Sequence, residues 1–424
     1  MSNLEREYNL FEKPKWFPIP GDKACILKWT QVSLYLWEGM SSSCHRNKSF
    51  PIGDDFDFHN TPEILADRTK MLAGEWPGFG HGCEHCRDQE QRGGVSDRMQ
   101  LLSMPTSERY VSQEMYDNPT NIKVPPTQLS VDFNNKCNMK CVYCGPNLST
   151  SWLKEQEKFG DRERIWDVDE PWRLDKTYAQ RQKQLMNWME NNYHKLKAFD
   201  ILGGEPMIQP ETFYYVDWMI KHPNKEIDFE LYSNMQIKPR IFRKKIQKFR
   251  ELAGYVKEVL WTASIDCWGP ASEYIRSGHD LETWEENWTY LLEKCPEIKT
   301  SMNWTVTPLS IPHIPELMKK VIEWNKVRYS AINFNKVIDP VWFNPGVFPQ
   351  GTFKNDIKNI IELNEIMCNR REYRDYIKSM FKEIDSAPTN YNIIEELKLF
   401  LDKLDSRRNT NWKETFPWLE TIKE

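Results

Sequence analysis

Residues 137–145 of the chain read Cys137-Asn-Met-Lys-Cys141-Val-Tyr-Cys144-Gly, and we refer to them as the cysteine loop. Three thiols spaced by three and then two residues fit one tight turn, where they can bind three irons of a [4Fe–4S] cube. The fourth iron would then lack a protein ligand and would be open to a substrate or cofactor. A zinc knuckle or part of a treble-clef zinc site is the alternative that the spacing alone leaves open.

Short apolar runs alternate with amphipathic stretches of helical period from residue 126 to about 345. We expect strands at 128–133, 198–202, 228–232, 258–265, 300–306 and 331–337, and helices at 178–196, 211–221, 239–255, 281–294 and 314–325. This alternation predicts an α/β fold in which right-handed crossovers join parallel strands. Six such strands form a partial (β/α)6 TIM-like barrel or a strongly curved sheet.

Two motifs follow the first two expected strands directly. The cysteine loop comes after the first strand, and Gly203-Gly204-Glu205-Pro206 ends the second. Loops at the carboxyl ends of parallel strands are where such folds build their sites. Two glycines let the backbone approach a ligand closely, and a carboxylate is a strong acceptor for an ammonium group. Taken alone, a Gly-Gly-Glu-Pro sequence would more often be an ordinary turn.

The cysteine loop, with an aromatic residue before its last cysteine, and the Gly-Gly-Glu-Pro sequence together resemble the radical S-adenosylmethionine (SAM) superfamily. The resemblance implies that Cys137, Cys141 and Cys144 bind a catalytic [4Fe–4S] cluster whose open iron chelates SAM. It also implies that one electron from the cluster cleaves SAM and that the 5′-deoxyadenosyl radical abstracts a hydrogen atom from substrate. The cofactors would supply the chemistry, and the protein would supply binding and shielding.

The resemblance further implies which residues bind SAM. They are Tyr143, Gly203, Gly204, Glu205, Ser233, Asn234, Ser264 and Arg276. The backbone of the Gly-Gly-Glu-Pro turn and Glu205 would hydrogen-bond the SAM amino group. Tyr143 would pack near the adenine, with simple packing of the loop as its alternative.

Polar residues after the third and fourth strands would contact the rest of SAM. Ser233 and Asn234 would face the ribose or the methionine moiety, although Met235 stands where the superfamily usually has glycine. Ser264 and Arg276 would hold the carboxylate or the ribose, because a guanidinium fork suits a carboxylate. A simple turn is the alternative for Ser233 and Asn234, and a surface ion pair is the alternative for Arg276.

Four further cysteines precede the expected barrel, namely Cys25, Cys44, Cys83 and Cys86. Hairpin-like strands around 30–37 and near Cys44 would bring them together. The pattern resembles the twitch/SPASM-like auxiliary cluster region of radical SAM enzymes, here placed at the N-terminus. Four thiolates can complete a second [4Fe–4S] cluster or an all-thiolate zinc site. We favour the cluster, because the chain already needs iron–sulfur assembly, and we expect His45, His81 and His85 to lie outside the ligand set.

The chain of 424 residues is long enough for one large domain and a smaller one. We expect the auxiliary metal region at 1–115, the radical SAM barrel at 126–345 and a C-terminal helical extension at 352–424. A net charge of −5 gives no electrostatic case for a nucleic-acid partner. No apolar run reaches the length of a membrane span, and the start lacks the apolar region of a secretory signal. We therefore expect a cytoplasmic protein whose clustered cysteines bind metal.

The function that these features predict is that of a radical SAM enzyme with an auxiliary cluster. By resemblance, a peptide side chain is the first substrate expected, and an electron donor such as flavodoxin or ferredoxin is implied. Two alternatives stay open. One is a radical SAM enzyme that acts on a small metabolite or a carbohydrate, and the other is a non-catalytic zinc- and cysteine-rich binding module.

Overall fold

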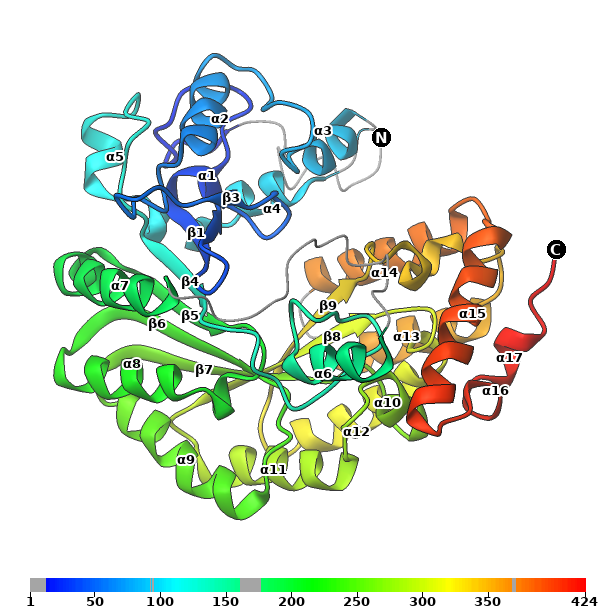
Figure 1. The fold of residues 1–424 in the computed structure, drawn as a ribbon. Coiled ribbons are helices and arrows are strands. Elements are labelled where there is room, and N and C mark those ends of the chain that lie inside the picture. Colours follow the sequence, from blue (N-terminus) through cyan, green and yellow to red (C-terminus); the bar gives the residue numbers. More distant parts are fainter. Residues whose placement is uncertain (1–12, 92, 94, 161–176, 368–370) are drawn as a thin grey trace.

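Within the described part of the chain, nine strands form one sheet with helices on its flanks (Figure 1). The computed structural model describes residues 13–91, 93, 95–160, 177–367 and 371–424. The strands are β1 (Gln31–Tyr35), β2 (Met40–Ser42), β3 (Phe50–Pro51), β4 (Gln128–Asp132), β5 (Ala198–Leu202), β6 (Asn224–Ser233), β7 (Val256–Ser264), β8 (Lys299–Val306) and β9 (Ala331–Lys336). Their order across the sheet is β3-β2-β1-β4-β5-β6-β7-β8-β9.

The six expected strands are all present as β4 to β9. Each pairs in parallel with the next along the chain. They form where buried apolar positions alternate with partly exposed ones, most clearly along β6. The described strands form an open row with β3 and β9 at its edges. The mixed α/β class is therefore confirmed, whereas the partial barrel stays a prediction.

The N-terminal residues contribute three strands to this same sheet, which the sequence did not predict. β1 and β2 form the expected antiparallel hairpin shortly before Cys44. However, β1 also pairs in parallel with β4. A separate apolar core in this region includes Trp29, Met71 and Met115. The N-terminal region thus has a core of its own but shares the sheet, and the three domain boundaries stay predictions.

Helices connect the strands and extend the chain beyond them. They are α1 (Ile26–Thr30), α2 (Pro62–Leu72), α3 (Glu84–Gln91), α4 (Asp97–Ser103), α5 (Gln113–Asp117), α6 (Thr150–Phe159), α7 (Tyr178–Asn192), α8 (Pro210–Lys221), α9 (Pro239–Leu252), α10 (Pro270–Ile275), α11 (Leu281–Lys294), α12 (Ile314–Asn325), α13 (Lys354–Met367), α14 (Arg371–Ser386), α15 (Tyr391–Arg408), α16 (Trp412–Thr415) and α17 (Pro417–Glu420). The five expected crossover helices are confirmed as α7, α8, α9, α11 and α12. Among the described residues, no helix is long and apolar enough to cross a membrane.

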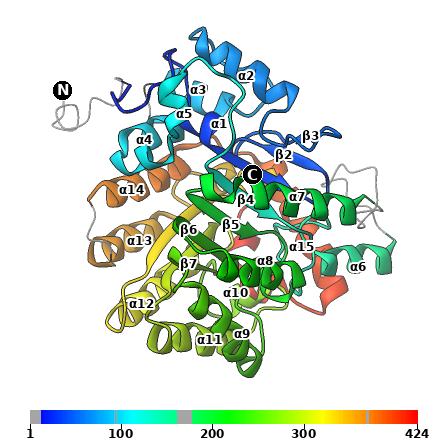
Figure 2. The same ribbon diagram turned by 90° about the vertical axis from the view of Figure 1, so that its left-hand side faces the viewer.

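One face of the parallel strands packs against α8, α9, α11 and α12, which lie along the same side of the sheet in both views (Figures 1 and 2). Aromatic contacts hold this layer together. The ring of Phe199 on β5 lies 6.1 Å from that of Tyr215 on α8, and Trp261 on β7 lies 5.3 Å from Phe249 on α9. Burying a side chain such as Phe199 stabilises the fold by about 1.5–3 kcal/mol.

The opposite face is polar, although parallel sheets are normally buried and apolar on both faces. Asp200 on β5 and Glu230 on β6 are direct neighbours there, and both are half-buried. Ser130 Oγ donates to Asp200 Oδ2 at 2.7 Å, and Thr262 Oγ1 donates to Glu230. We call this surface the polar face, and its central members are Ser130, Asp132, Asp200, Glu230, Tyr232 and Thr262.

The polar face should make the metal-free protein less stable as the pH rises. Burial, followed by the charge of Glu230, raises the pKa of Asp200 to about 8, whereas an unfolded aspartate ionises at about 3.9. Between these values the folded state binds more protons than the unfolded state, so the free energy of unfolding falls with increasing pH. We expect the thermal unfolding midpoint to fall from about pH 5 to about pH 8.5, and to fall less in Asp200→Asn.

The matched control is Glu226→Gln, which removes an exposed carboxylate from the same sheet. It should keep the pH dependence of the wild-type protein. An equal fall of the midpoint in the wild-type protein and in Asp200→Asn would contradict the assignment.

Candidate metal centre and cofactor site

The cysteine loop lies between the end of β4 and the segment that follows α10. Val142 N donates to Ile275 O, and Lys140 N donates to Ser277 O, both at 2.8 Å. These backbone hydrogen bonds fix the middle of the loop against the segment that carries Arg276. The expected metal-binding loop and the expected Arg276 are therefore neighbours.

Glu205 joins the ends of two neighbouring strands. Its side chain is fully buried, and Oε1 accepts hydrogen bonds from Ser233 Oγ at 2.9 Å and from Met207 N at 3.0 Å. Its other oxygen, Oε2, accepts one from Asn234 N at 2.6 Å. Burial raises the pKa of Glu205 to about 7, and the hydrogen bonds oppose this shift. Glu205 thus positions the ends of β5 and β6, and its contact with SAM stays a prediction.

The packing of the chain itself requires glycine at positions 203 and 204. Gly203 and Gly204 have φ values of +78° and +51°. A Cβ on Gly203 would lie 1.6 Å from Asp132 Oδ1, and one on Gly204 would lie 2.4 Å from Lys136 O. Sequence reasoning missed Gln209, whose Nε2 donates to Gly203 O at 2.8 Å and holds the turn in place. Its signal in the sequence is weak, a polar residue at the start of α8.

Asn234 reaches the cysteine loop from the end of β6. Its Nδ2 donates to Asn138 Oδ1 at 3.0 Å and lies 3.9 Å from Cys137 Sγ. Met235, the next residue, has a φ of +62°, in the left-handed region that glycine adopts most easily. Met235 is fully buried, and Trp261 Nε1 donates to its Sδ at 3.0 Å. Packing therefore holds this turn in a glycine-like conformation although it lacks a glycine.

Arg276 forms a buried ion pair beside the cysteine loop. Its Nη2 donates to Asp266 Oδ1 at 2.8 Å, and 7% of its side chain is exposed, which excludes the surface ion pair considered above. Tyr143 OH donates to Asp266 Oδ2 at 2.7 Å. The Arg276 Nε is buried without a hydrogen-bond partner. Ser264 lies half-buried at the end of β7.

Helix α15 supports the cysteine loop from near the end of the chain. Arg408, with 4% of its side chain exposed, donates from Nη1 to Lys140 O at 3.1 Å and from Nε to Glu155 at 3.2 Å. Its guanidinium lies 4.5 Å from the Trp152 ring, and Trp152 Nε1 donates to Cys141 O at 2.7 Å. Sequence reasoning missed Arg408, because it meets Lys140 across 268 positions of the chain.

The three thiols of the loop influence one another's ionisation. A hydrogen bond with Cys141, followed by burial, raises the pKa of Cys144, and burial raises the pKa of Cys137 to about 12. The hydrogen bond with Cys144 lowers the pKa of Cys141, and the charges of Arg276 and Arg408 also act to lower it. Because metals bind thiolates, a metal group would displace the protons of these thiols.

A multi-iron cluster and a single metal ion would place the three sulfur atoms differently, and which of them the loop binds stays a prediction. In a tetrahedral zinc site the thiolates share one ion at about 2.3 Å each, which brings their sulfur atoms together. Among the described residues, no three His, Cys, Asp or Glu side chains are arranged to hold one ion. The thiolates of a four-iron cube bind different irons and lie farther apart. Two buried cations, Arg276 and Arg408, lie near the loop, and each is also paired with a buried carboxylate, Asp266 and Glu155 respectively.

The four N-terminal cysteines also lie near one another. Cys25 precedes α1, Cys44 follows β2, and Cys83 and Cys86 flank the start of α3. Burial, followed by the charges of Cys44, Cys86 and Cys83, raises the pKa of Cys25. Burial likewise raises the pKa of Cys83 to about 12. The structure thus brings the four thiols into one region, and the metal that they bind stays a prediction.

A buried ion pair lies next to these thiols. Arg98 Nη2 lies 2.6 Å from Glu90 Oε2, and Ser96 Oγ donates to Glu90 Oε1 at 2.6 Å. Arg98 Nη1 also donates to Ala24 O at 3.2 Å, which places the guanidinium beside Cys25. The polar residues that follow Cys86 in the sequence therefore pack next to the four N-terminal cysteines.

Two of the nearby histidines face carboxylates. His81 Nδ1 lies 2.8 Å from Asp67 Oδ1, and Asp67 also forms a buried ion pair with Lys28 at 2.6 Å. His45 Nε2 lies 3.6 Å from Asp97 Oδ2. His45 Nδ1 also lies 4.0 Å from Cys44 Sγ, and the expectation that these histidines lie outside the ligand set stays a prediction.

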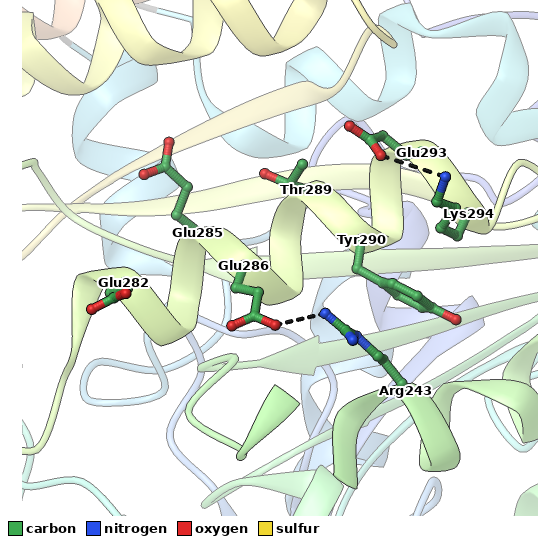
Figure 3. Close-up of a pocket in the computed structure, with 8 residues that line it drawn as sticks. All are labelled: Arg243, Glu282, Glu285, Glu286, Thr289, Tyr290, Glu293 and Lys294. Atoms are coloured by element: carbon green, nitrogen blue, oxygen red, sulfur yellow. Dashed lines mark hydrogen bonds and ion pairs between the residues drawn. The ribbon is translucent and has the colours of Figure 1, made fainter. Parts of the chain in front are cut away.

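An open hollow of about 580 Å³ lies between α9 and α11 (Figure 3). Its lining is mainly acidic, with Glu282, Glu285, Glu286 and Glu293 on α11. An ion pair of 2.6 Å joins Glu286 to Arg243 on α9. None of the residues singled out in the sequence lines this hollow, so it is a surface feature separate from the candidate cofactor site.

Comparison with known proteins gives a limited result. No family model and no curated protein matches the chain. Crystal structures of Streptococcus suis SuiB resemble it: SuiB bound to S-adenosylmethionine has 15% identity and a TM-score of 0.36 over 77% of this chain and 66% of SuiB. SuiB bound to the precursor peptide SuiA has 14% identity and a TM-score of 0.36 over 79% of this chain and 67% of SuiB. At these TM-scores the likeness carries no argument about function, and this chain spans slightly less than two thirds of the first SuiB chain.

Met235 provides a test of the turn after β6. Met235→Ala and Met235→Gly lose the same buried side chain, but alanine must also adopt the left-handed conformation. We expect the alanine variant to be less stable than the glycine variant by about 1 kcal/mol. Urea unfolding of the two variants measures the difference. An alanine variant as stable as the glycine variant would show that the turn is not held at positive φ.

Arg408 provides a test of the support from α15. Arg408→Met keeps the apolar stem but removes the hydrogen bonds to Lys140 and Glu155, which should cost about 1.5–3 kcal/mol. Hydrogen–deuterium exchange of the amides at 140–142 should become faster. Lys413→Met, which changes an exposed residue on α16, is the control and should leave exchange unchanged. Unchanged exchange in the Arg408 variant would mean that α15 does not hold the loop.

Proposed function

We propose that this protein is a radical SAM enzyme whose cysteine loop holds a catalytic [4Fe–4S] cluster. The observation that supports this most is that separate motifs meet at the loop. Glu205 N donates to Lys136 O at 2.8 Å at the entry to the loop, and Asn234 Nδ2 donates to Asn138 within it. A non-catalytic zinc module has no need for two neighbouring strand ends to converge on its metal loop.

The chain's own residues would bind and orient SAM. The proposed set is Tyr143, Gly203, Gly204, Glu205, Ser233, Asn234, Ser264 and Arg276, at the carboxyl ends of strands in a partial (β/α)6 barrel. Asp266 balances the charge of Arg276, and the Nε that Asp266 leaves without a partner can donate to a carboxylate. The bound cluster and SAM would supply reductive cleavage of SAM and hydrogen-atom abstraction. Burial of the loop would keep water away from that step.

The N-terminal cysteines would hold an auxiliary [4Fe–4S] cluster in a twitch/SPASM-like region. Lys28 and Arg98 lie beside the thiols, each in an ion pair with a carboxylate, an environment that suits a zinc site and a cluster equally. A reducing cytoplasm and a donor such as flavodoxin or ferredoxin belong to this proposal. A peptide side chain is the proposed substrate.

The test is SAM cleavage by anaerobically reconstituted protein. With SAM and dithionite, the wild-type protein should bind about eight irons per chain, as two clusters require, and form 5′-deoxyadenosine. Cys141→Ala should lose about half of the iron and all of the product. Cys83→Ala should also lose about half of the iron but keep part of the SAM cleavage. Iron analysis and mass spectrometry of the nucleoside give both readouts.

The control is Cys295→Ala, which changes a buried thiol that belongs to neither group. It should retain the full iron content and full SAM cleavage. Full SAM cleavage by Cys141→Ala would contradict the proposed function, and zinc at both sites would support the binding module instead.

A further inference from the structure

The polar face holds two neighbouring carboxylates that lack a cationic partner. Asp200 and Glu230 face each other across β5 and β6, and the partners of their oxygens include the hydroxyl groups of Ser130 and Thr262. In the described residues neither carboxylate forms an ion pair. By contrast, Asp228 on the same strand as Glu230 pairs with Arg109.

A third carboxylate next to them is unpartnered. Asp132 lies two residues beyond Ser130 on β4, and alternation along a strand places both on the same face. Its side chain is nine-tenths buried, and its Oδ1 has no hydrogen-bond partner. Three adjacent strands, β4, β5 and β6, therefore each present a carboxylate to one surface with no cation among the described residues to balance it.

In such an arrangement the ionised forms of the carboxyl groups are unfavourable unless something positive binds to them. Burial raises the pKa of Asp132 to about 8, and burial followed by Glu230 does the same for Asp200. A buried carboxylate without a partner favours its neutral form, and an adjacent cation would restore the charged form. The three groups are therefore matched to a ligand that carries a positive charge and several hydrogen-bond donors.

The position of the carboxylates suggests what that ligand is. Asp200 lies three residues before Gly203, and Glu230 lies three residues before Ser233. At about 3.3 Å per residue, both lie roughly 10 Å back along the strands from the turns that meet the cysteine loop. Asp132 lies between them and the loop, against Gly203. A molecule that reaches them would extend from the loop into the polar face, beyond the place proposed for SAM.

We propose that Asp132, Asp200 and Glu230 form a subsite for an ammonium or guanidinium group of the substrate, as on a lysine or arginine side chain of a peptide. The subsite rests on the proposed function for its place beside the SAM site. The ammonium group of SAM is the other possible source of such a cation, and the experiment separates the two sources.

The probes are three blocked tripeptides, acetyl-Gly-Lys-Gly-amide, acetyl-Gly-Arg-Gly-amide and acetyl-Gly-norleucine-Gly-amide. Calorimetry on full-length reconstituted protein with SAM present measures their binding. The lysine and arginine peptides should bind at least about tenfold more tightly than the norleucine peptide, since hydrogen bonds to charged groups contribute that much. The double variant Asp200→Asn, Glu230→Gln should lose this preference. Glu226→Gln, the matched exposed control, should keep it.

Each outcome decides the proposal. Equal binding of the lysine and norleucine peptides by the wild-type protein, or no binding of either, overturns it without any variant and would fit a neutral, proton-sharing pair. Loss of SAM binding by the double variant also overturns it, because the carboxylates would then serve SAM. Charge-dependent peptide binding without 5′-deoxyadenosine formation would support the subsite while the proposed function fails. SAM cleavage without charge-dependent peptide binding would support the proposed function while the subsite fails.

Discussion

A single buried carboxylate holds the site together. Glu205 follows the end of β5 and has no contact with solvent, and it accepts hydrogen bonds from the end of β6 and from the turn that follows Glu205 itself. A buried carboxylate is stable only while both of its oxygens accept hydrogen bonds. The ends of β5 and β6 must therefore stay in register with each other. The glycines before it and Asn234 after β6 then take fixed places against the cysteine loop. The position of the loop therefore depends on the hydrogen bonds that the Glu205 carboxylate accepts.

Distant parts of the chain add a second layer of support. The buried Glu155 on α6 forms ion pairs with Arg408 on α15 and with Lys140 of the cysteine loop, so this carboxylate links the helix to the loop. Tyr274, two residues before Arg276, donates a hydrogen bond from its OH to Asp405 Oδ1 at 2.7 Å. Asp405 lies on α15, the helix that also carries Arg408. The C-terminal helices are thus part of the structure around the loop, although no motif in them suggests it.

The sequence predicted the elements that local patterns determine. Alternation of apolar residues placed β4 to β9 and their crossover helices, because side-chain burial repeats every second residue in a strand and about every fourth in a helix. It did not predict that β1 joins β4, because that pairing depends on a contact between residues about 100 positions apart. The cysteine loop, the Gly-Gly-Glu-Pro turn and Arg276 were predicted as neighbours, and they are neighbours in the structure.

The partners of those residues were much harder to predict. The carboxylates of Glu205 and Asp266 engage the protein itself, and Arg408 and Gln209 carry no motif. Met235 shows why a departure from a pattern need not change a backbone, since packing against Trp261 keeps its positive φ. The alternation of Asp228, Glu230 and Tyr232 along β6 indicates a polar face of the sheet. The pairing of Glu230 with Asp200, however, is known only from the structure.

The central claim concerns one iron without a protein ligand at the cysteine loop. Mössbauer spectroscopy of iron-57 protein that lacks the four N-terminal cysteines tests it most directly, because a single cluster then remains. We predict that SAM changes the signal of about one iron in four and leaves the others unchanged. A cluster whose irons are all indifferent to SAM, or a protein that takes up zinc and no iron at this loop, would contradict the account.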